Sequence, residues 1–289
     1  MQRQQSFQNN KASLYVIATP IGNLKEISPR VIEALNDVDT VFCEDTRVTG
    51  QLLKHLDIKK TLISAHENIE KQSSNKILEK LQNGENVAFM SDAGYPGISD
   101  PGSLVIKEVI ENDFNVVVIN GPSALIQSVL ASGLSTDRFY FYGFLNAKPS
   151  IRIKELEGLK EFKDTLIFYQ SPHKILSCLT DMLNVFGDRK VCLCRELTKK
   201  FEEYIRGNIS EIIPICETLK GEMVLVVEGN TQKETSVVAL KDCVAMIDEK
   251  IMSGLSKKEA IKEVVLLTKT NKKELYNFYH NEKGEQEDE

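Results

Sequence analysis

Short apolar runs alternate with amphipathic stretches through the first part of the chain. Between the runs, apolar residues recur every three or four positions, which is the spacing of a helix with one buried face. Strands that alternate with helices predict an α/β domain on a parallel sheet, and we place it at residues 13–122. The predicted strands occupy residues 14–18, 40–43, 61–64, 86–90 and 115–119.

The stretch from Ser91 to Gly102 follows the fourth apolar run and leads into a predicted helix. It holds three glycines and two prolines, with Asp92 and Asp100 near its ends. Such residues produce a tight, irregular backbone whose N–H groups are free to face a ligand. Because ligands of open α/β sheets bind at the carboxyl ends of strands, we expect a binding site here. An ordinary connecting loop is the alternative.

Polar loops also follow the other predicted strands, which predicts one shared binding cleft. Ser123 stands near the first turn of a helix, where exposed N–H groups favour an acceptor or an anion. Glu44 and Asp45 are adjacent, so their side chains diverge, and a helix cap or a salt bridge with Arg47 explains them at least as well as paired catalysis. His66 reads as a hydrogen-bonded loop residue, and His173 at a helix start is a candidate anion contact.

The later part of the chain differs in pattern. Residues 123–232 contain four or five more predicted strands, mostly in a mixed or antiparallel order that the sequence does not specify further, and they predict a second α/β domain. The link between the two domains is short, so they should touch and form a cleft. Residues 233–283 predict a helical tail domain, whose segment from Lys250 to Lys273 has seven lysines and two glutamates, a local charge of 7 − 2 = +5. We expect residues 1–12 to be a disordered lead-in and residues 284–289 an acidic disordered end.

Composition narrows the class of protein. The 289 residues are 42% hydrophobic, and no apolar run approaches the roughly 18 residues of a membrane span. A net charge of −6 argues against a globally basic nucleic-acid-binding protein, but not against a local basic surface. Six scattered cysteines without a CxxC pair indicate buried, reduced thiols rather than a zinc site, which suits a cytoplasmic protein.

Several catalytic motifs are missing from the sequence. There is no GxxxxGK[ST] loop, no GxGxxG after the first strand and no GxSxG elbow. The residues alone therefore predict a cleft enzyme that holds a polar cofactor through backbone-rich loops, without a phosphate-specific device and without a metal.

Taken together, the loop segments resemble the ribosomal small-subunit methyltransferase I family, a branch of the tetrapyrrole methylases. The resemblance is collinear over about residues 13–280, and the string SDAGxPxISDPG is its most specific part. Tetrapyrrole methylases usually carry GxGPG after the first strand, whereas this chain lacks the first glycines, which favours the RNA branch over a corrin substrate. The segments are Ala18-Thr19-Pro20-Ile21-Gly22-Asn23-Leu24, Glu44-Asp45-Thr46-Arg47, Ser91–Gly102, Gly121-Pro122-Ser123-Ala124, Gln170-Ser171-Pro172-His173 and Cys194-Arg195-Glu196-Leu197-Thr198-Lys199.

The resemblance implies a two-domain α/β fold with S-adenosylmethionine in the cleft between the domains, a small helical C-terminal domain and a homodimer. It implies methylation of a cytidine ribose 2′-OH in the decoding region of 16S rRNA, on the 30S subunit. Methyl transfer needs alignment of the reactants and benefits from a base, and RNA must meet positive charge. Two alternatives stay open, namely a corrin methyltransferase of the same superfamily and a non-catalytic ribosome-binding module.

The expected site residues fall into three groups. The basic tail is an RNA contact, or else a solvated helical surface or dimer contact. Glu196 is a further candidate for the base. The cofactor group is Pro20, Asp92, Ala93, Gly94, Gly97, Ile98, Ser99, Ser123 and Ala124; the catalytic candidates are Asp92, Asp100, Asp45 and Glu44; and the RNA group is Arg47, Lys174, Arg195, Lys199, Lys257 and Lys258.

Overall fold

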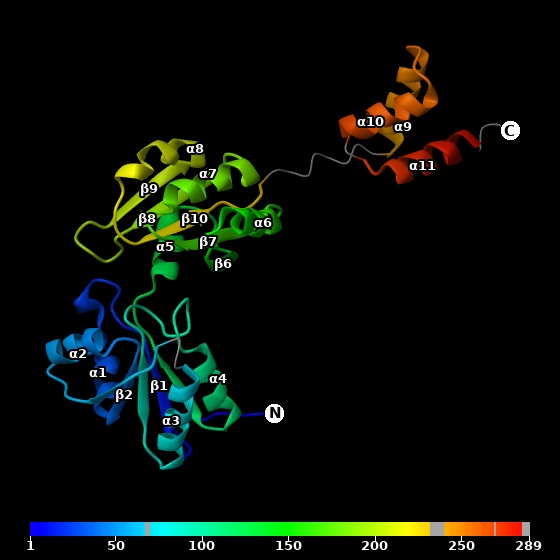
Figure 1. The fold of residues 1–289 in the computed structure, drawn as a ribbon. Helices are drawn as coiled ribbons and strands as arrows, with labels where there is room; N and C mark the ends of the chain where they lie inside the picture. The colour runs from blue at the N-terminus through cyan, green and yellow to red at the C-terminus, as the bar shows by residue number, and fades with distance from the viewer. Residues whose placement is uncertain (67–69, 232–239, 269, 285–289) are drawn as a thin grey trace. The chain divides into compact units, whose positions relative to one another are not determined.

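The computed structural model describes residues 1–66, 70–231, 240–268 and 270–284 of the chain. These residues form two compact units, Met1–Asn230 and Thr231–Glu289. The first unit contains two five-stranded sheets flanked by helices, and the second unit is helical (Figure 1). The predicted α/β class and the helical C-terminal region are confirmed.

The first sheet is parallel throughout, with its strands in the order β3-β2-β4-β1-β5. Strands β2 and β4 are buried at every position, as expected for inner strands covered on both faces. All five predicted strands are present. Their bounds are β1 Ser13–Ile17, β2 Thr40–Cys43, β3 Thr61–Ser64, β4 Val87–Met90 and β5 Asn115–Ile119.

Helices cover both faces of this sheet. Leu35 of α1 and Leu53 of α2 pack with Ile17 and Met90 on one face, whereas α3 and α4 pack around Phe89 on the other. Helix α2 begins at Thr46, directly after its capping residue Asp45. The bounds are α1 Pro29–Asn36, α2 Thr46–His55, α3 Glu70–Gln82 and α4 Ser103–Glu111, with a short 3₁₀ helix at Leu24–Glu26.

Two neighbouring strands of the first sheet send the chain to opposite faces. From β1 the chain turns toward the face covered by α1 and α2, and from the adjacent β4 it turns toward the face covered by α3 and α4. The loops therefore diverge at the carboxyl ends of β1 and β4 and leave a crevice between them. In open α/β sheets this switch point is where ligands bind.

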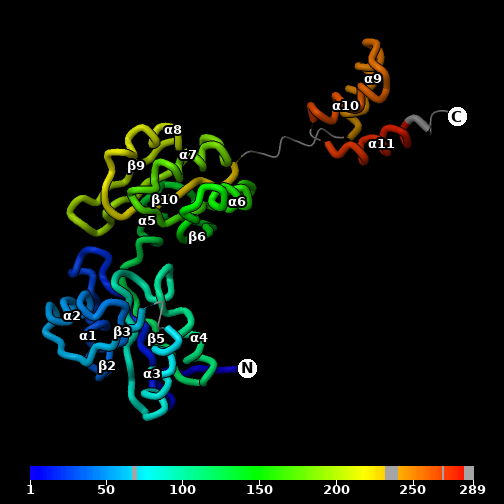
Figure 2. The backbone as a smooth tube through the Cα atoms, viewed as in Figure 1, coloured from blue at the N-terminus to red at the C-terminus, as the bar shows by residue number. Residues whose placement is uncertain are grey.

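The second sheet is mixed, in the order β6-β7-β10-β8-β9, with only β6 and β7 parallel among its described pairs. The chain enters it through the segment that leads into α5 (Figure 2). Helix α5 packs on one face, while α6, α7, α8 and a 3₁₀ helix at Ile213–Thr218 cover the other. The bounds are α5 Ala124–Ser132, β6 Phe139–Phe144, α6 Pro149–Leu159, β7 Thr165–Gln170, α7 Ile175–Phe186, β8 Lys190–Arg195, β9 Glu203–Asn208, α8 Ile209–Ile212 and β10 Met223–Val227.

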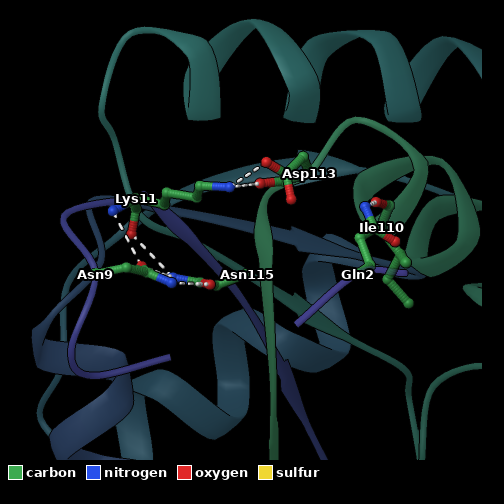
Figure 3. Close-up of polar contacts among 6 residues, drawn as sticks. All are labelled: Gln2, Asn9, Lys11, Ile110, Asp113 and Asn115. Atoms are coloured by element: carbon green, nitrogen blue, oxygen red, sulfur yellow. Dashed lines mark hydrogen bonds and ion pairs between the residues drawn. The ribbon is translucent and has the colours of Figure 1, made fainter. Parts of the chain in front are cut away.

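Residues 1–12, expected from their composition to be disordered, lie against the edge strand β5 in this structure. The Gln4 side chain donates to the Val116 carbonyl at 2.8 Å and accepts from the Val116 amide at 3.1 Å, so it pairs as a neighbouring strand would. Lys11 forms an ion pair with Asp113, and Asn9 bonds Asn115 (Figure 3). These contacts occupy polar groups that an uncovered edge strand would present for pairing.

The C-terminal unit has a hydrophobic core of its own, built from α9 Leu240–Met252, α10 Lys257–Thr268 and α11 Lys272–Gly284. Helix α10 is capped at its start, since the Ser256 hydroxyl accepts from the Glu259 amide while the Glu259 carboxylate accepts from Ser256. The first residues of the predicted tail domain, up to 239, and the expected acidic end from residue 285 lie outside the described residues.

All six cysteines are buried thiols, as expected. Within the part of the chain that the structure describes, none of the helices is both long enough and apolar enough to cross a membrane.

Candidate active site

The loop between β4 and α4 has an irregular backbone held by its own hydrogen bonds. Gly94, Gly97 and Ser99 all have positive φ angles, of 76°, 82° and 64°. The Gly97 amide donates to the Pro101 carbonyl at 3.0 Å, which closes the loop on itself. A non-glycine residue in the left-handed region, here Ser99, is uncommon and concentrates at functional sites.

This loop is joined to the loop that follows β1. The Thr19 amide donates to the Gly94 carbonyl at 2.9 Å, and the Gly94 amide donates back to the Thr19 carbonyl at 3.1 Å. The Thr19 hydroxyl also donates to the Ser91 carbonyl at 3.2 Å. These three hydrogen bonds hold the two loops at the switch point together.

A tyrosine joins the same loop to the loop after β5. The Tyr95 hydroxyl donates to the Gly121 carbonyl at 3.2 Å and accepts from the Gly121 amide at 3.1 Å. A Cβ atom at Gly121 would lie 2.9 Å from the Ala18 Cβ and 3.0 Å from the Ala18 carbonyl oxygen. Glycine at this position therefore allows the loops after β1 and β5 to come together beneath Tyr95.

We expect Tyr95→Phe to lower the free energy of unfolding by roughly 1–3 kcal/mol, because it leaves both polar groups of the Gly121 peptide without their partner. Denaturant unfolding of the full chain measures this change. Tyr140→Phe, which removes the hydroxyl of a side chain at the exposed edge of β6, is the matched control and should leave stability within about 0.5 kcal/mol. Equal stability of the two variants would contradict this role of Tyr95.

Four carboxylates follow β2 and β4, and three of them have structural partners. Asp45 caps α2 and accepts from the Arg47 amide at 2.8 Å; hydrogen bonds from the Arg47 guanidinium and amide lower the pKa of Asp45 to about 2. Asp92 accepts from the Asp45 amide at 3.1 Å, and Glu44 accepts from the Asp92 amide at 3.4 Å. The cap and ion-pair interpretation of Asp45 is confirmed, and Asp92 and Glu44 brace the loops after β2 and β4.

Asp100 differs from these three carboxylates. Burial, and secondarily the charges of Glu44 and Asp92, raises the pKa of Asp100 to about 6. A carboxyl group with this pKa is largely ionised at neutral pH and more basic than a surface aspartate. Within the described ranges, no group of three or more His, Cys, Asp or Glu side chains is placed to hold a metal ion.

A cavity of about 370 Å³ opens beside these loops, within the size range of small-molecule sites, roughly 300–1,000 Å³. Its walls are mostly apolar, and its charged lining groups are two carboxylates, Asp100 and Glu222. Among the described residues, no lysine, arginine or histidine lines it. The lining comes from both sheets of the first unit: Ile21, Ala93, Gly94, Tyr95, Ile98, Ser99, Asp100, Ser123, Ala124, Leu125, Phe144, Tyr169, Gln170, Ser171, Pro172, Leu197, Glu222, Met223 and Val224.

The cavity brings together most of the residues expected to bind the cofactor. Of the four catalytic candidates, only Asp100 lines it. Pro20, Asp92 and Gly97 do not line it, although Gly97 and Asp92 support the loop that does. The expected cofactor residues in its walls are Ala93, Gly94, Ile98, Ser99, Ser123 and Ala124.

The expected RNA-contacting cations lie in different environments. Arg47 and Lys174 are exposed, although Arg47 also pairs with Asp45. Arg195 pairs with Glu203 at 2.7 Å, and Lys199 pairs with Glu196 at 3.0 Å and with Glu222 at 2.8 Å. The charges of Arg195 and Lys199 are thus largely balanced within the protein. In the C-terminal unit, Lys257 lies over the Tyr279 ring at 4.9 Å, and Lys258 is exposed.

Sequence reasoning did not name the cavity residues contributed by the second sheet. Phe144 ends β6, Tyr169 and Gln170 end β7, and Met223 begins β10. In the sequence these residues stand at the ends of apolar runs, a pattern that does not distinguish a cavity wall from an ordinary strand end. Of these four residues, only Gln170 lies in a segment that the family resemblance had identified, Gln170 to His173. That segment was the one sequence signal for this wall of the cavity.

The strand order, the switch point and the cavity define an α/β protein with a small-molecule cavity lined by both of its sheets. The profile of the family described as Tetrapyrrole (Corrin/Porphyrin) Methylases matches residues 13–213. The chain is also 41% identical, over 98% of its length and 100% of the relative, to ribosomal RNA small subunit methyltransferase I of Halalkalibacterium halodurans. The same-named protein of Bacillus subtilis is 40% identical over 97% of this chain and 99% of its own. This chain belongs to the ribosomal RNA small subunit methyltransferase I family of the tetrapyrrole methylases.

Solved structures share the fold at much lower identity. Uroporphyrin-III-C-methyltransferase from Thermus thermophilus matches with a TM-score of 0.56 and 16% identity, covering 75% of this chain and 94% of that one. Diphthine synthase matches with a TM-score of 0.57 and 14% identity, covering 75% and 90%. Their names differ in substrate, so the fold alone does not specify what is methylated.

Proposed function

We propose that this enzyme transfers a methyl group from S-adenosylmethionine to the ribose 2′-oxygen of a cytidine in the decoding region of 16S rRNA, on the 30S subunit. The observation that carries the proposal is the cavity at the switch point, which has two carboxylates and no basic residue among its described lining. The relatives' name, ribosomal RNA small subunit methyltransferase I, supports RNA as the substrate class.

The lining of the cavity fits S-adenosylmethionine and disfavours a phosphate-bearing cofactor. This donor carries a sulfonium and an ammonium against one carboxylate, so it is a net cation. The Asp100 carboxylate opposes that charge, whereas the charge of Glu222 is partly balanced by Lys199. Aromatic faces attract cations as well, and Phe144 and Tyr169 lie 5.6 Å apart between ring centroids in the same wall. When bound, the sulfonium supplies an electrophilic methyl group.

We assign the acceptor of the ribose proton to Asp100. Removal of that proton as the oxygen attacks contributes typically about 10²–10⁴-fold to the rate of such a reaction. Among the four carboxylates that follow β2 and β4, Asp100 is the one in the cavity wall, and burial raises its pKa to about 6, which suits a base at neutral pH. Asp92, Glu44 and Asp45 then position the loops rather than react.

The exposed Arg47 and Lys174 and the lysines of the helical unit are the proposed phosphate contacts, and we propose a homodimer as the working form. Phosphate binding by a few such cations would make the affinity for RNA fall as salt rises. Arg195 and Lys199 contribute less to this binding in our proposal, because carboxylates already hold them.

The function is tested by incubating the protein with methyl-labelled S-adenosylmethionine and 30S subunits that lack the modification, then mapping the labelled nucleotide. We expect label in 16S rRNA at a cytidine ribose of the decoding region. A corrin precursor serves as the second substrate, and Asp113→Asn, a surface carboxylate change, is the matched control for variants. Transfer to the corrin precursor with no transfer to 30S subunits would overturn the proposal.

A further inference from the structure

Buried residues show which face of helix α11 packs against the rest of the C-terminal unit. Leu275 and Tyr279 are buried, with 0% and 4% of their surfaces exposed. The Tyr279 hydroxyl donates to a carboxylate oxygen of Asp248 at 2.7 Å, and Lys257 lies over the Tyr279 ring. The opposite side of α11 therefore faces outward in the C-terminal unit.

An aromatic and basic stripe runs along an exposed flank of α11, next to the packed face. Lys272, Tyr276 and His280 are four residues apart and follow one another along the helix, while Lys273 and Asn277 form the adjoining row. All five residues are exposed. By the same spacing, Glu274 and Glu282 lie outside the stripe, so it contains cations, rings and an amide but no carboxylate.

The two rings of the stripe are neighbours. The centroids of Tyr276 and His280 are 4.5 Å apart, and 46% of the Tyr276 surface is exposed. Across the described residues, no ion pair joins Lys272 or Lys273 to an acidic group. Exposed rings placed beside unneutralised lysines suit a partner that offers flat faces and negative charge together.

We propose that the stripe Lys272, Lys273, Tyr276, Asn277 and His280 binds an unpaired RNA segment. Bases stack on Tyr276 and His280, and the lysines contact the flanking phosphates. An apolar protein surface would leave both lysines without partners, and a regular RNA duplex would keep its base faces covered. This inference rests on the proposed function for the identity of the RNA, and it deepens that function by naming where the substrate is held.

The inference is tested with the full-length protein and a fluorescein-labelled single-stranded RNA of mixed sequence, by anisotropy over a salt series. Tyr276→Ala should weaken binding about 5- to 150-fold, the effect of losing one stacked base. Tyr276→Phe, which keeps the ring, should bind as the unaltered protein does. Lys272→Gln and Lys273→Gln should each reduce the slope of log affinity against log salt by about 0.7. Met252→Ala, an exposed and uncharged position on α9 of the same unit, is the control for folding and should change nothing.

The outcomes separate this surface from the proposed function. In the methyl-transfer assay, Tyr276→Ala should raise KM for 30S subunits and leave kcat and the affinity for S-adenosylmethionine unchanged. If the unaltered protein methylates no 30S subunits but Tyr276→Ala still weakens oligonucleotide binding, the RNA-binding stripe is supported and the proposed function is overturned. If Tyr276→Ala binds the oligonucleotide as tightly as the unaltered protein, the proposal that the stripe binds RNA is wrong. A loss of affinity for 30S subunits by this variant would then indicate a contact with a ribosomal protein.

Discussion

The Asp100→Asn variant is expected to transfer methyl groups about 10²–10⁴-fold more slowly than the unaltered enzyme, because the amide cannot accept a proton. The loss should fall on kcat. The affinity for S-adenosylmethionine should change by less than about tenfold, since Asp100 is one of several lining groups. Single-turnover transfer to 30S subunits and calorimetric titration of the cofactor measure the two quantities separately.

Asp92→Asn is the matched variant for this test. Its amide oxygen can still accept the hydrogen bond from the Asp45 amide, so the braced loop should persist and transfer should stay within about threefold. If Asp92→Asn loses as much activity as Asp100→Asn, the assignment of the base to Asp100 is wrong. The same conclusion follows if Asp100→Asn retains full turnover.

The dependence on pH follows from the same group. The base must be ionised, so kcat/KM should fall about tenfold per pH unit below pH 6, the region of the pKa of Asp100, and should level above it. The same pKa shift acts on the stability of the fold in the opposite direction. Because the pKa of Asp100 is higher in the folded than in the unfolded protein, this group stabilises the fold below about pH 4, and that stabilisation is lost as the pH rises through 6. At pH 7, Asp100→Asn should therefore be at least as stable as the unaltered protein, while less active.

The sequence pattern predicted the elements of the first sheet but not their order. Buried parallel strands read as continuous apolar runs, and Val87–Met90 is such a run. Nothing local specifies that β4 inserts between β2 and β1, because that position depends on which faces the connecting helices cover. For the second sheet, the pattern predicted a mostly mixed or antiparallel order, but apolar runs do not encode which strands pair, so the place of β10 between β7 and β8 could only be observed.

The candidate site was predictable where glycine and proline mark the backbone. The run from Ser91 to Gly102 was recognisable for that reason, and it supplies six of the cavity's lining residues, between Ala93 and Asp100. Choosing among the carboxylates was not possible from sequence. Asp45, Asp92 and Asp100 are the same residue type in similar loops, and they differ only in partners and burial, which are tertiary properties.

Gly102 ends this loop in a conformation that other residues avoid. Its φ and ψ are 135° and −22°, and a Cβ atom there would lie 3.0 Å from Cε1 of the buried Phe89 and 3.1 Å from the Gly97 amide nitrogen. Its amide also donates to a Glu70 carboxylate oxygen at 2.9 Å, which holds the start of α4. Backbone strain and crowding would act together on any side chain at this position.

We therefore expect Gly102→Ala to lower the free energy of unfolding by about 2–5 kcal/mol, with roughly equal parts from strain and from crowding. This is a large share of the roughly 5–15 kcal/mol that stabilises a typical domain. Activity should fall as well, because Asp100 is two residues away. Gly133→Ala is the matched control: its φ of 78° is also positive, but nothing lies within 4 Å of its Cβ position, so only strain of about 1–2 kcal/mol applies. Equal losses in the two variants, measured by denaturant unfolding, would mean that Phe89 and Gly97 do not confine the loop.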